Sequence, residues 1–75
     1  MSINIYLVHE KFSQKIRIER VKNKYSQEKL AELAGVHRTT ISAIERETMS
    51  PSLETICRIA NALNLSLTEI FNFNF

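Results

Sequence analysis

The sequence has little of what breaks helices and little of what builds disulfide or metal sites. Its 75 residues include one glycine, one proline, one cysteine and no tryptophan. The single cysteine, Cys57, excludes an internal disulfide framework. So few glycines and prolines, beside 44% hydrophobic residues, are typical of a compact helical domain and not of a disordered tail. We therefore expect one all-α domain that spans residues 1–75.

Long apolar runs and targeting segments are also missing from the chain. No stretch approaches the roughly 20 consecutive apolar residues that a membrane-spanning helix needs. The N-terminal residues Met-Ser-Ile-Asn lack the basic region of a secretory signal. These two absences predict a cytoplasmic protein that has no membrane partner.

The residue groups on which catalysis and metal binding depend are absent as well. The two histidines, His9 and His37, are far apart in the chain, and neither belongs to a metal-binding spacing such as HExxH or CxxC. No glycine-rich phosphate loop is present, and a domain of this size filled by helices leaves little room for a substrate pocket. We expect no enzymatic activity, cofactor, metal ion or small-molecule substrate.

Positive charge is concentrated in one part of the chain. Residues 11–46 hold nine Lys or Arg against four Glu, whereas residues 51–75 hold one Arg against two Glu. This asymmetry suits a nucleic-acid-binding surface on one side of the molecule, although most charged runs are simply solvated surface. Charge alone therefore does not establish what the protein binds.

Residues 27–46 (QEKLAELAGVHRTTISAIER) have the pattern of two short helices joined by a tight turn. We expect the helices over Gln27–Ala34 and Arg38–Arg46. Gly35 stands where the first helix must end with a left-handed residue, and the small Ala31 allows the second helix to cross closely. The apolar contacts between the two helices come from Val36, Ile41 and Ile44. This spacing predicts a helix-turn-helix motif.

Three more helices are expected around this motif. The first covers about His9–Asn23. The fourth covers about Pro51–Leu63, with Ser50 as its N-cap. The fifth covers about Leu67–Asn72 and is opened by a capping box in Ser66-Leu67-Thr68-Glu69.

The two ends of the chain alternate between apolar and other residues. Residues 3–7 alternate in this way and favour a strand, but Ile5, Val8 and Phe12 also line one face of a helix. Residues 71–75 alternate again. A solitary strand exposes unpaired backbone groups, so two terminal strands would have to pair, at or near a dimer interface.

The chain resembles the Cro and phage-repressor family of helix-turn-helix proteins, also called the XRE family. The resemblance lies in SQEKLAELAGVHRTTISAIER, in SPSLETICRIANALNLSLTEIF, and in Phe12, Ile16 and Arg20, which together cover about residues 12–71. It implies a five-helix, repressor-like domain. The segment HRTTISAIER is similar to the controller proteins of restriction-modification systems.

The resemblance implies a sequence-specific regulator of transcription that binds double-stranded DNA. Such a protein acts as a homodimer and reads a pseudo-palindromic operator through the major groove. A controller protein would regulate restriction-modification genes.

The exposed side of the second helix of the motif is the candidate base-reading surface. Ile41 and Ile44 must face the core, and the N-terminal part of a recognition helix is what reaches base edges. Arg38 can bond guanine O6 and N7 together, although most protein–DNA hydrogen bonds go to phosphates. In the resembling family the same position reads bases. The expected base-reading residues are Arg38, Thr39, Ser42 and Ala43.

Further roles follow from the same resemblance. In the family, a glutamine at the place of Gln27 braces the reading residues and contacts a phosphate. An arginine at the place of Arg20 pairs with the glutamate late in the recognition helix, which is Glu45 here. The expected phosphate contacts are Gln27, His37, Arg46, Thr48 and Ser50.

The C-terminal part of the chain carries more apolar residues than a short last helix needs. An exposed apolar patch of this kind usually marks an interface, which favours a homodimer. The expected interface residues are Leu65, Leu67, Ile70, Phe71 and Phe73.

Two other functions compete with DNA-dependent regulation. An antitoxin-type protein-interaction module of the same fold would carry an extra segment that wraps its toxin, and only residues 71–75 are available for it. An RNA-binding helical domain would place aromatic residues among its basic ones, and this chain does not.

Overall fold

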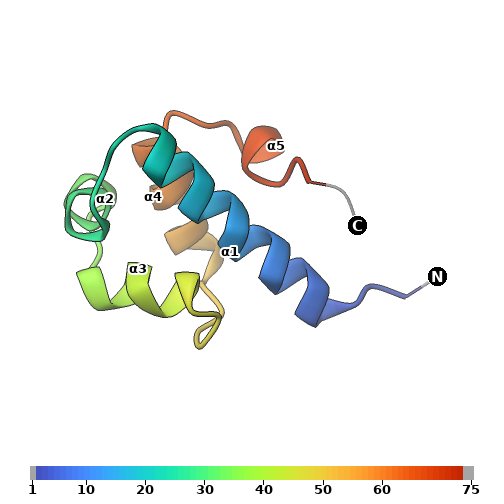
Figure 1. Ribbon diagram of the computed structural model, residues 1–75. Helices are drawn as coiled ribbons and strands as arrows, with labels where there is room; N and C mark the ends of the chain where they lie inside the picture. Colours follow the sequence, from blue (N-terminus) through green and yellow to red (C-terminus); the bar gives the residue numbers. More distant parts are fainter. Residues whose placement is uncertain (1, 74–75) are drawn as a thin grey trace.

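The computed structural model describes residues 2–73 and contains five helices and no strand in that range (Figure 1). The helices are α1 (Ile5–Lys22), α2 (Gln27–Ala34), α3 (Arg38–Glu45), α4 (Leu53–Ala62) and α5 (Leu67–Ile70). The predicted five-helix, all-α fold is confirmed. The boundaries of α2 agree with those predicted, and α3 ends one residue earlier, with Arg46 as its C-cap.

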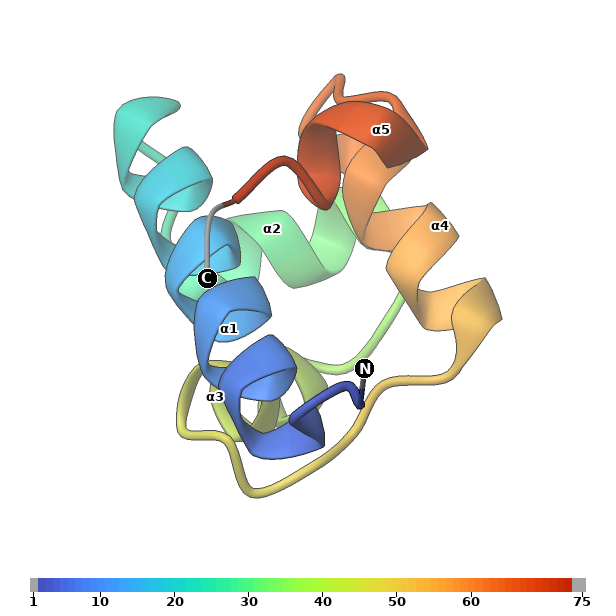
Figure 2. The same cartoon turned by 90° about the vertical axis from the view of Figure 1, so that its right-hand side faces the viewer.

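The long helix α1 runs across the molecule and contacts both α3 and α5 (Figure 1). Helix α2 packs against α3 and α4, and α4 contacts α5. Figure 2 shows the start of α1, the loop between α3 and α4, and the chain after α5 on one common face. The core between the helices consists of Phe12, Ile16, Leu30, Ala31, Ala34, Ile41, Ile44, Ile59, Ala60, Leu63 and Ile70.

The N-terminal strand that the alternating residues favoured does not form. Helix α1 begins at Ile5, because the side chain of Asn4 accepts hydrogen bonds from the backbone N–H groups of Tyr6 and Leu7. Capping satisfies backbone donors that a solitary strand would leave unpaired. At the other end, residues 71–73 form a turn and an irregular segment, and residues 74–75 lie outside the described part of the chain.

The later helices are shorter than predicted. Helix α4 is capped by Ser52, which accepts from the N–H of Thr55, so the predicted Ser50 cap is wrong. Pro51 precedes the helix and lines an apolar pocket instead of occupying the first helical position. The capping box of α5 forms as predicted between Ser66 and Glu69.

Helices α1 to α4 are each followed by a residue in the left-handed conformation. These residues are Lys24 (φ 60°), Gly35 (φ 70°), Glu47 (φ 61°) and Asn64 (φ 56°). Glycine adopts this conformation without cost and asparagine adopts it readily, but a lysine or glutamate is strained there. The chain thus stores backbone strain at Lys24 and Glu47.

Substitution Lys24→Gly is expected to raise the free energy of unfolding by about 0.5–1 kcal/mol, because it removes the Cβ that opposes a left-handed backbone. Chemical denaturation of the two proteins measures this difference. Lys24→Ala is the matched control, since it removes the same charge and keeps the Cβ. An equal gain in both variants would assign the effect to charge and contradict the backbone explanation.

Candidate nucleic-acid interface

The turn between α2 and α3 depends on Gly35. Its φ of 70° ends α2 in the left-handed conformation, and a Cβ at this position would lie 3.2 Å from Nη1 of Arg58. The left-handed conformation therefore favours glycine here, whereas the nearby Arg58 side chain is half exposed and can move aside. After the turn, His37 is the extended N-cap of α3, and its side chain makes no capping hydrogen bond.

The packing of α3 determines which of its residues are exposed. Ile41 and Ile44 have no exposed surface, as the sequence pattern required. The candidate base-reading residues are exposed (Arg38, Thr39) or half-buried (Ser42, Ala43). The polar side chains of Arg38 and Thr39 thus stand on the first turn of α3. The small residues Ser42 and Ala43 follow one turn later, where they allow the helix backbone to approach a groove closely.

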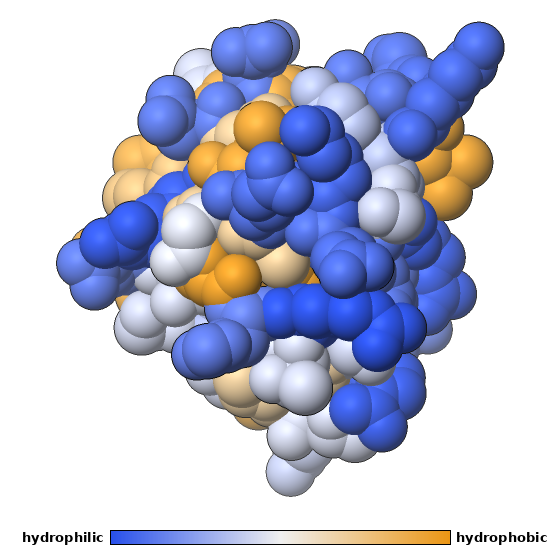
Figure 3. Space-filling view, turned by 90° about the vertical axis from the view of Figure 1, so that its left-hand side faces the viewer, coloured by the Kyte–Doolittle hydropathy of each residue, from blue (hydrophilic) through white to orange (hydrophobic). Residues whose placement is uncertain are grey.

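The face formed by α2 differs from the exposed side of α3. Figure 3 views the molecule from the side of α2 and shows a mainly hydrophilic surface with small separate apolar areas. The exposed charged residues of α2 are Glu28, Lys29 and Glu32, and Lys29 lies 3.7 Å from Glu32 in an exposed ion pair. With two carboxylates and one ammonium group, α2 does not present an excess of positive charge to a polyanion.

Four of the five candidate phosphate contacts lie at the two ends of α3, whereas Gln27 lies at the start of α2 and is bonded to Glu45. His37 is exposed at the N-terminus of α3, and Arg46, Thr48 and Ser50 are exposed in the segment after its C-terminus. Arg46 Nε donates to the carbonyl of Ser42 at 3.3 Å, and Thr48 Oγ1 donates to the carbonyl of Ala43 at 3.2 Å. Their contacts with phosphate stay a prediction.

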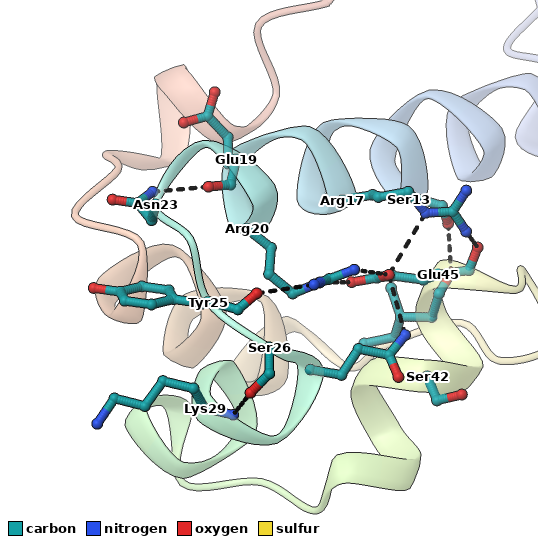
Figure 4. A network of polar contacts seen from close by, with 12 residues as sticks. Ser13, Arg17, Glu19, Arg20, Asn23, Tyr25, Ser26, Lys29, Ser42 and Glu45 are labelled. Carbon is teal, nitrogen blue, oxygen red and sulfur yellow. Dashed lines mark hydrogen bonds and ion pairs between the residues drawn. The ribbon is translucent and has the colours of Figure 1, made fainter.

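Arg20 and Glu45 join α1 to the end of α3 (Figure 4). Arg20 Nε lies 2.7 Å from Glu45 Oε2, and Arg20 Nη2 lies 3.0 Å from Glu45 Oε1. Arg20 also donates to the carbonyl of Tyr25, and Gln27 Nε2 donates to Glu45 Oε1 at 3.2 Å. The Glu45 side chain is only 2% exposed. A bidentate pair of this kind orients both partners. Together with the bond from Gln27, it ties α1, α2 and α3 together.

The surroundings of Glu45 determine its charge. Burial by itself raises the pKa of Glu45, but hydrogen bonds from Arg20 and Gln27, with the charges of Arg20 and Arg17, outweigh burial and hold that pKa below its ordinary value. The hydrogen bond to Glu45 raises the pKa of Arg20. The pair is therefore ionised at neutral pH.

Three side chains of α1 that bond to the end of α3 or to the loop after it were missed from the sequence. They are His9, Ser13 and Arg17. Ser13 is buried and donates to the carbonyl of Ile44 at 2.6 Å, and Arg17 Nη2 donates to the carbonyl of Glu45 at 3.1 Å. Their four-residue spacing places them on one side of a helix, which is the signal that could have identified them.

The candidate dimer interface needs one correction. Ile70 has no exposed surface, so its prediction as an interface residue is wrong, because its side chain belongs to the core of the monomer. Leu67 and Phe71 are 48% and 42% exposed, and the ring of Phe71 stacks on Phe12 at a centroid distance of 5.6 Å. Leu65 and Phe73 are partly buried against the core.

Neither a metal-binding cluster nor a membrane-spanning helix is found in the described part of the chain. Among residues 2–73, no group of three His, Cys, Asp or Glu side chains is placed to hold a metal ion. No helix in that range is long and apolar enough to cross a membrane.

Comparison with known proteins agrees with the helix-turn-helix fold. The family model described as helix-turn-helix matches residues 16–70. Control protein C.BamHI of Bacillus amyloliquefaciens is 43% identical over 74 residues, which cover 97% of this chain and 88% of that relative. Control protein C.SmaI of Serratia marcescens is 38% identical over 63 residues, which cover 84% of this chain and 75% of that relative.

Solved structures give the same result. The restriction-modification controller protein C.AhdI from Aeromonas hydrophila aligns with a TM-score of 0.79 and 35% identity, over 83% of this chain and 94% of that one. Wild-type controller protein C.Esp1396I aligns with a TM-score of 0.80 and 30% identity, over 85% and 82% of the two chains. The chain belongs to the XRE-type helix-turn-helix family of DNA-binding transcriptional regulators.

Proposed function

We propose that the protein is a homodimeric controller protein that binds a pseudo-palindromic operator and regulates restriction-modification genes. The observation that carries the DNA-reading part is the exposed first turn of α3, where Arg38 and Thr39 stand on a helix braced by Glu45 against α1 and α2. A rigid helix with an exposed N-terminal turn is what enters a major groove.

The dimer is supported by apolar surface that the monomer leaves exposed. Leu67 and Phe71 are each nearly half exposed near the C-terminal end of the described chain. Burying them against a second copy would remove this surface from water. A two-fold dimer then presents two copies of α3 to half-sites about one helical turn, ~34 Å, apart.

The regulated genes are inferred from similarity. Relatives that are 38% and 43% identical are named control proteins, and structural neighbours are named restriction-modification controller proteins. Selection of bound duplexes from a random pool tests the DNA-binding part of the proposal. The expected result is an enriched pseudo-palindrome, and recovery of no enriched sequence would contradict it.

Binding is expected to weaken strongly with salt. If Arg46 of both protomers neutralises a phosphate, the plot of log K against log[salt] has a slope of about −2 or steeper, since each neutralised phosphate contributes about −0.9. Titrations of a selected duplex between low and moderate salt measure it. A slope near zero would exclude phosphate neutralisation and with it the DNA-binding surface proposed here.

A further inference from the structure

One side of α1 is bonded to the backbone at and beyond the end of α3. Ser13 and Arg17 donate to carbonyls of the last turn of α3. One turn before Ser13, His9 Nε2 lies 2.9 Å from the carbonyl oxygen of Met49, in the loop that follows α3. The three side chains lie about one helical turn apart along α1, and each bonds to a different carbonyl. His9 is the one that reaches the loop.

The chemistry of the His9 contact assigns its direction. A carbonyl oxygen only accepts, so Nε2 of His9 carries the hydrogen and donates it to Met49. The bond joins positions 40 apart in the sequence and is partly buried. The imidazole also lines an apolar pocket of about 310 Å³, together with Ser50 and Pro51. His9 therefore borders the same pocket as the loop residues and is bonded to that loop.

The first half of the loop is held by α3 itself. The chain leaves the helix through the left-handed Glu47, and both the N–H and the hydroxyl of Thr48 bond to the carbonyl of Ala43, at 2.9 and 3.2 Å. Beyond Thr48 the chain turns away from α3. The bond from His9 holds the next carbonyl, that of Met49.

We propose that His9 is a positioning residue that holds the 46–50 loop in its DNA-contacting conformation. Its hydrogen bond fixes the residue between Thr48 and Ser50, two predicted phosphate contacts. The inference rests on the proposed function, because only a DNA-binding protein uses this loop against phosphates. A loop that is already fixed before binding loses less conformational entropy when the protein binds the duplex, and this strengthens binding.

The matched variants His9→Gln and His9→Asn test this proposal. The amide nitrogen of glutamine can reach the place of Nε2 and donate to Met49, whereas that of asparagine is too short by about one bond. Both variants of the full chain are titrated with a duplex that the wild-type protein selects from a random pool. For His9→Asn we expect a Kd about 2- to 10-fold weaker at one fixed salt concentration, because a looser loop loses more conformational entropy on binding, and for His9→Gln the wild-type Kd.

Folding is checked separately, by thermal unfolding, and binding is measured well below each transition. If His9→Asn does not fold, His9→Leu takes its place, because leucine keeps an apolar side chain at the wall of the pocket and has no donor. An unchanged Kd in the Asn or Leu variant would overturn the proposal, and so would an equal loss of affinity in His9→Gln, which would assign the effect to the loss of the ring and not of the hydrogen bond. A wild-type slope near zero would instead overturn the proposed function, and this inference with it.

Discussion

Replacement of Arg20 by methionine is expected to lower the free energy of unfolding by about 3–5 kcal/mol, the usual effect of removing one partner of a buried ion pair. Arg20 makes two hydrogen bonds to Glu45, whose side chain is 2% exposed. Without Arg20, the buried Glu45 carboxylate still accepts a hydrogen bond from Gln27 and lies near the more distant Arg17. These two contacts do not replace the two hydrogen bonds of a bidentate partner. Denaturation by urea measures the loss.

Two further variants distinguish this explanation from a general effect of losing a cation. Lys29→Met removes a charge from an exposed pair and is expected to change stability by less than about 1 kcal/mol. The double variant Arg20→Met with Glu45→Met is expected to recover much of the lost stability, because no buried charge remains. A double variant no more stable than Arg20→Met would contradict the explanation that the loss comes from a buried carboxylate left without its partner.

The same pair predicts a dependence of stability on pH. The pKa of Glu45 in the folded protein lies below its ordinary value of 4.5, so the folded state binds this proton less readily than the unfolded state. The resulting stability is fully present above about pH 4.5 and is lost as pH falls through the folded pKa. Unfolding of wild type and Glu45→Gln between pH 3 and 7 measures it, and a constant difference would contradict it.

Substitution Arg38→Ala is expected to weaken binding to the selected operator by about 1–3 kcal/mol, roughly 5- to 150-fold in Kd. The guanidinium of Arg38 is exposed on the first turn of α3, where two hydrogen bonds to guanine O6 and N7 are within the reach of a recognition helix. The preference for guanine should relax at one position of each half-site. Titration of matched operators with that base pair exchanged measures this specificity.

Arg46→Ala is the control for the Arg38 experiment. It removes the same charged group from a predicted phosphate contact, and it should weaken binding to cognate and scrambled duplexes by similar factors. If Arg38→Ala also weakened both duplexes equally, Arg38 would be a phosphate contact and its base-reading role would be wrong.

The sequence determined the elements whose signals are local. Gly35 ends α2, the Ser66 capping box opens α5, and both could be predicted because the bonds involved join residues within one or two helical turns. The exposed side of α3 also followed from the sequence, because Ile41 and Ile44 must be buried and a helix has a fixed period.

Only the tertiary structure decided the features that depend on contacts between distant residues. Pro51 favours Ser50 as the cap on local grounds, and Ile70 and Phe71 are both apolar, yet α4 is capped by Ser52 and only Ile70 is fully buried. The bond between His9 and Met49 joins two residues that no sequence period relates. Periodicity and capping describe one helix at a time, whereas burial and bonds between helices depend on how all five of them pack.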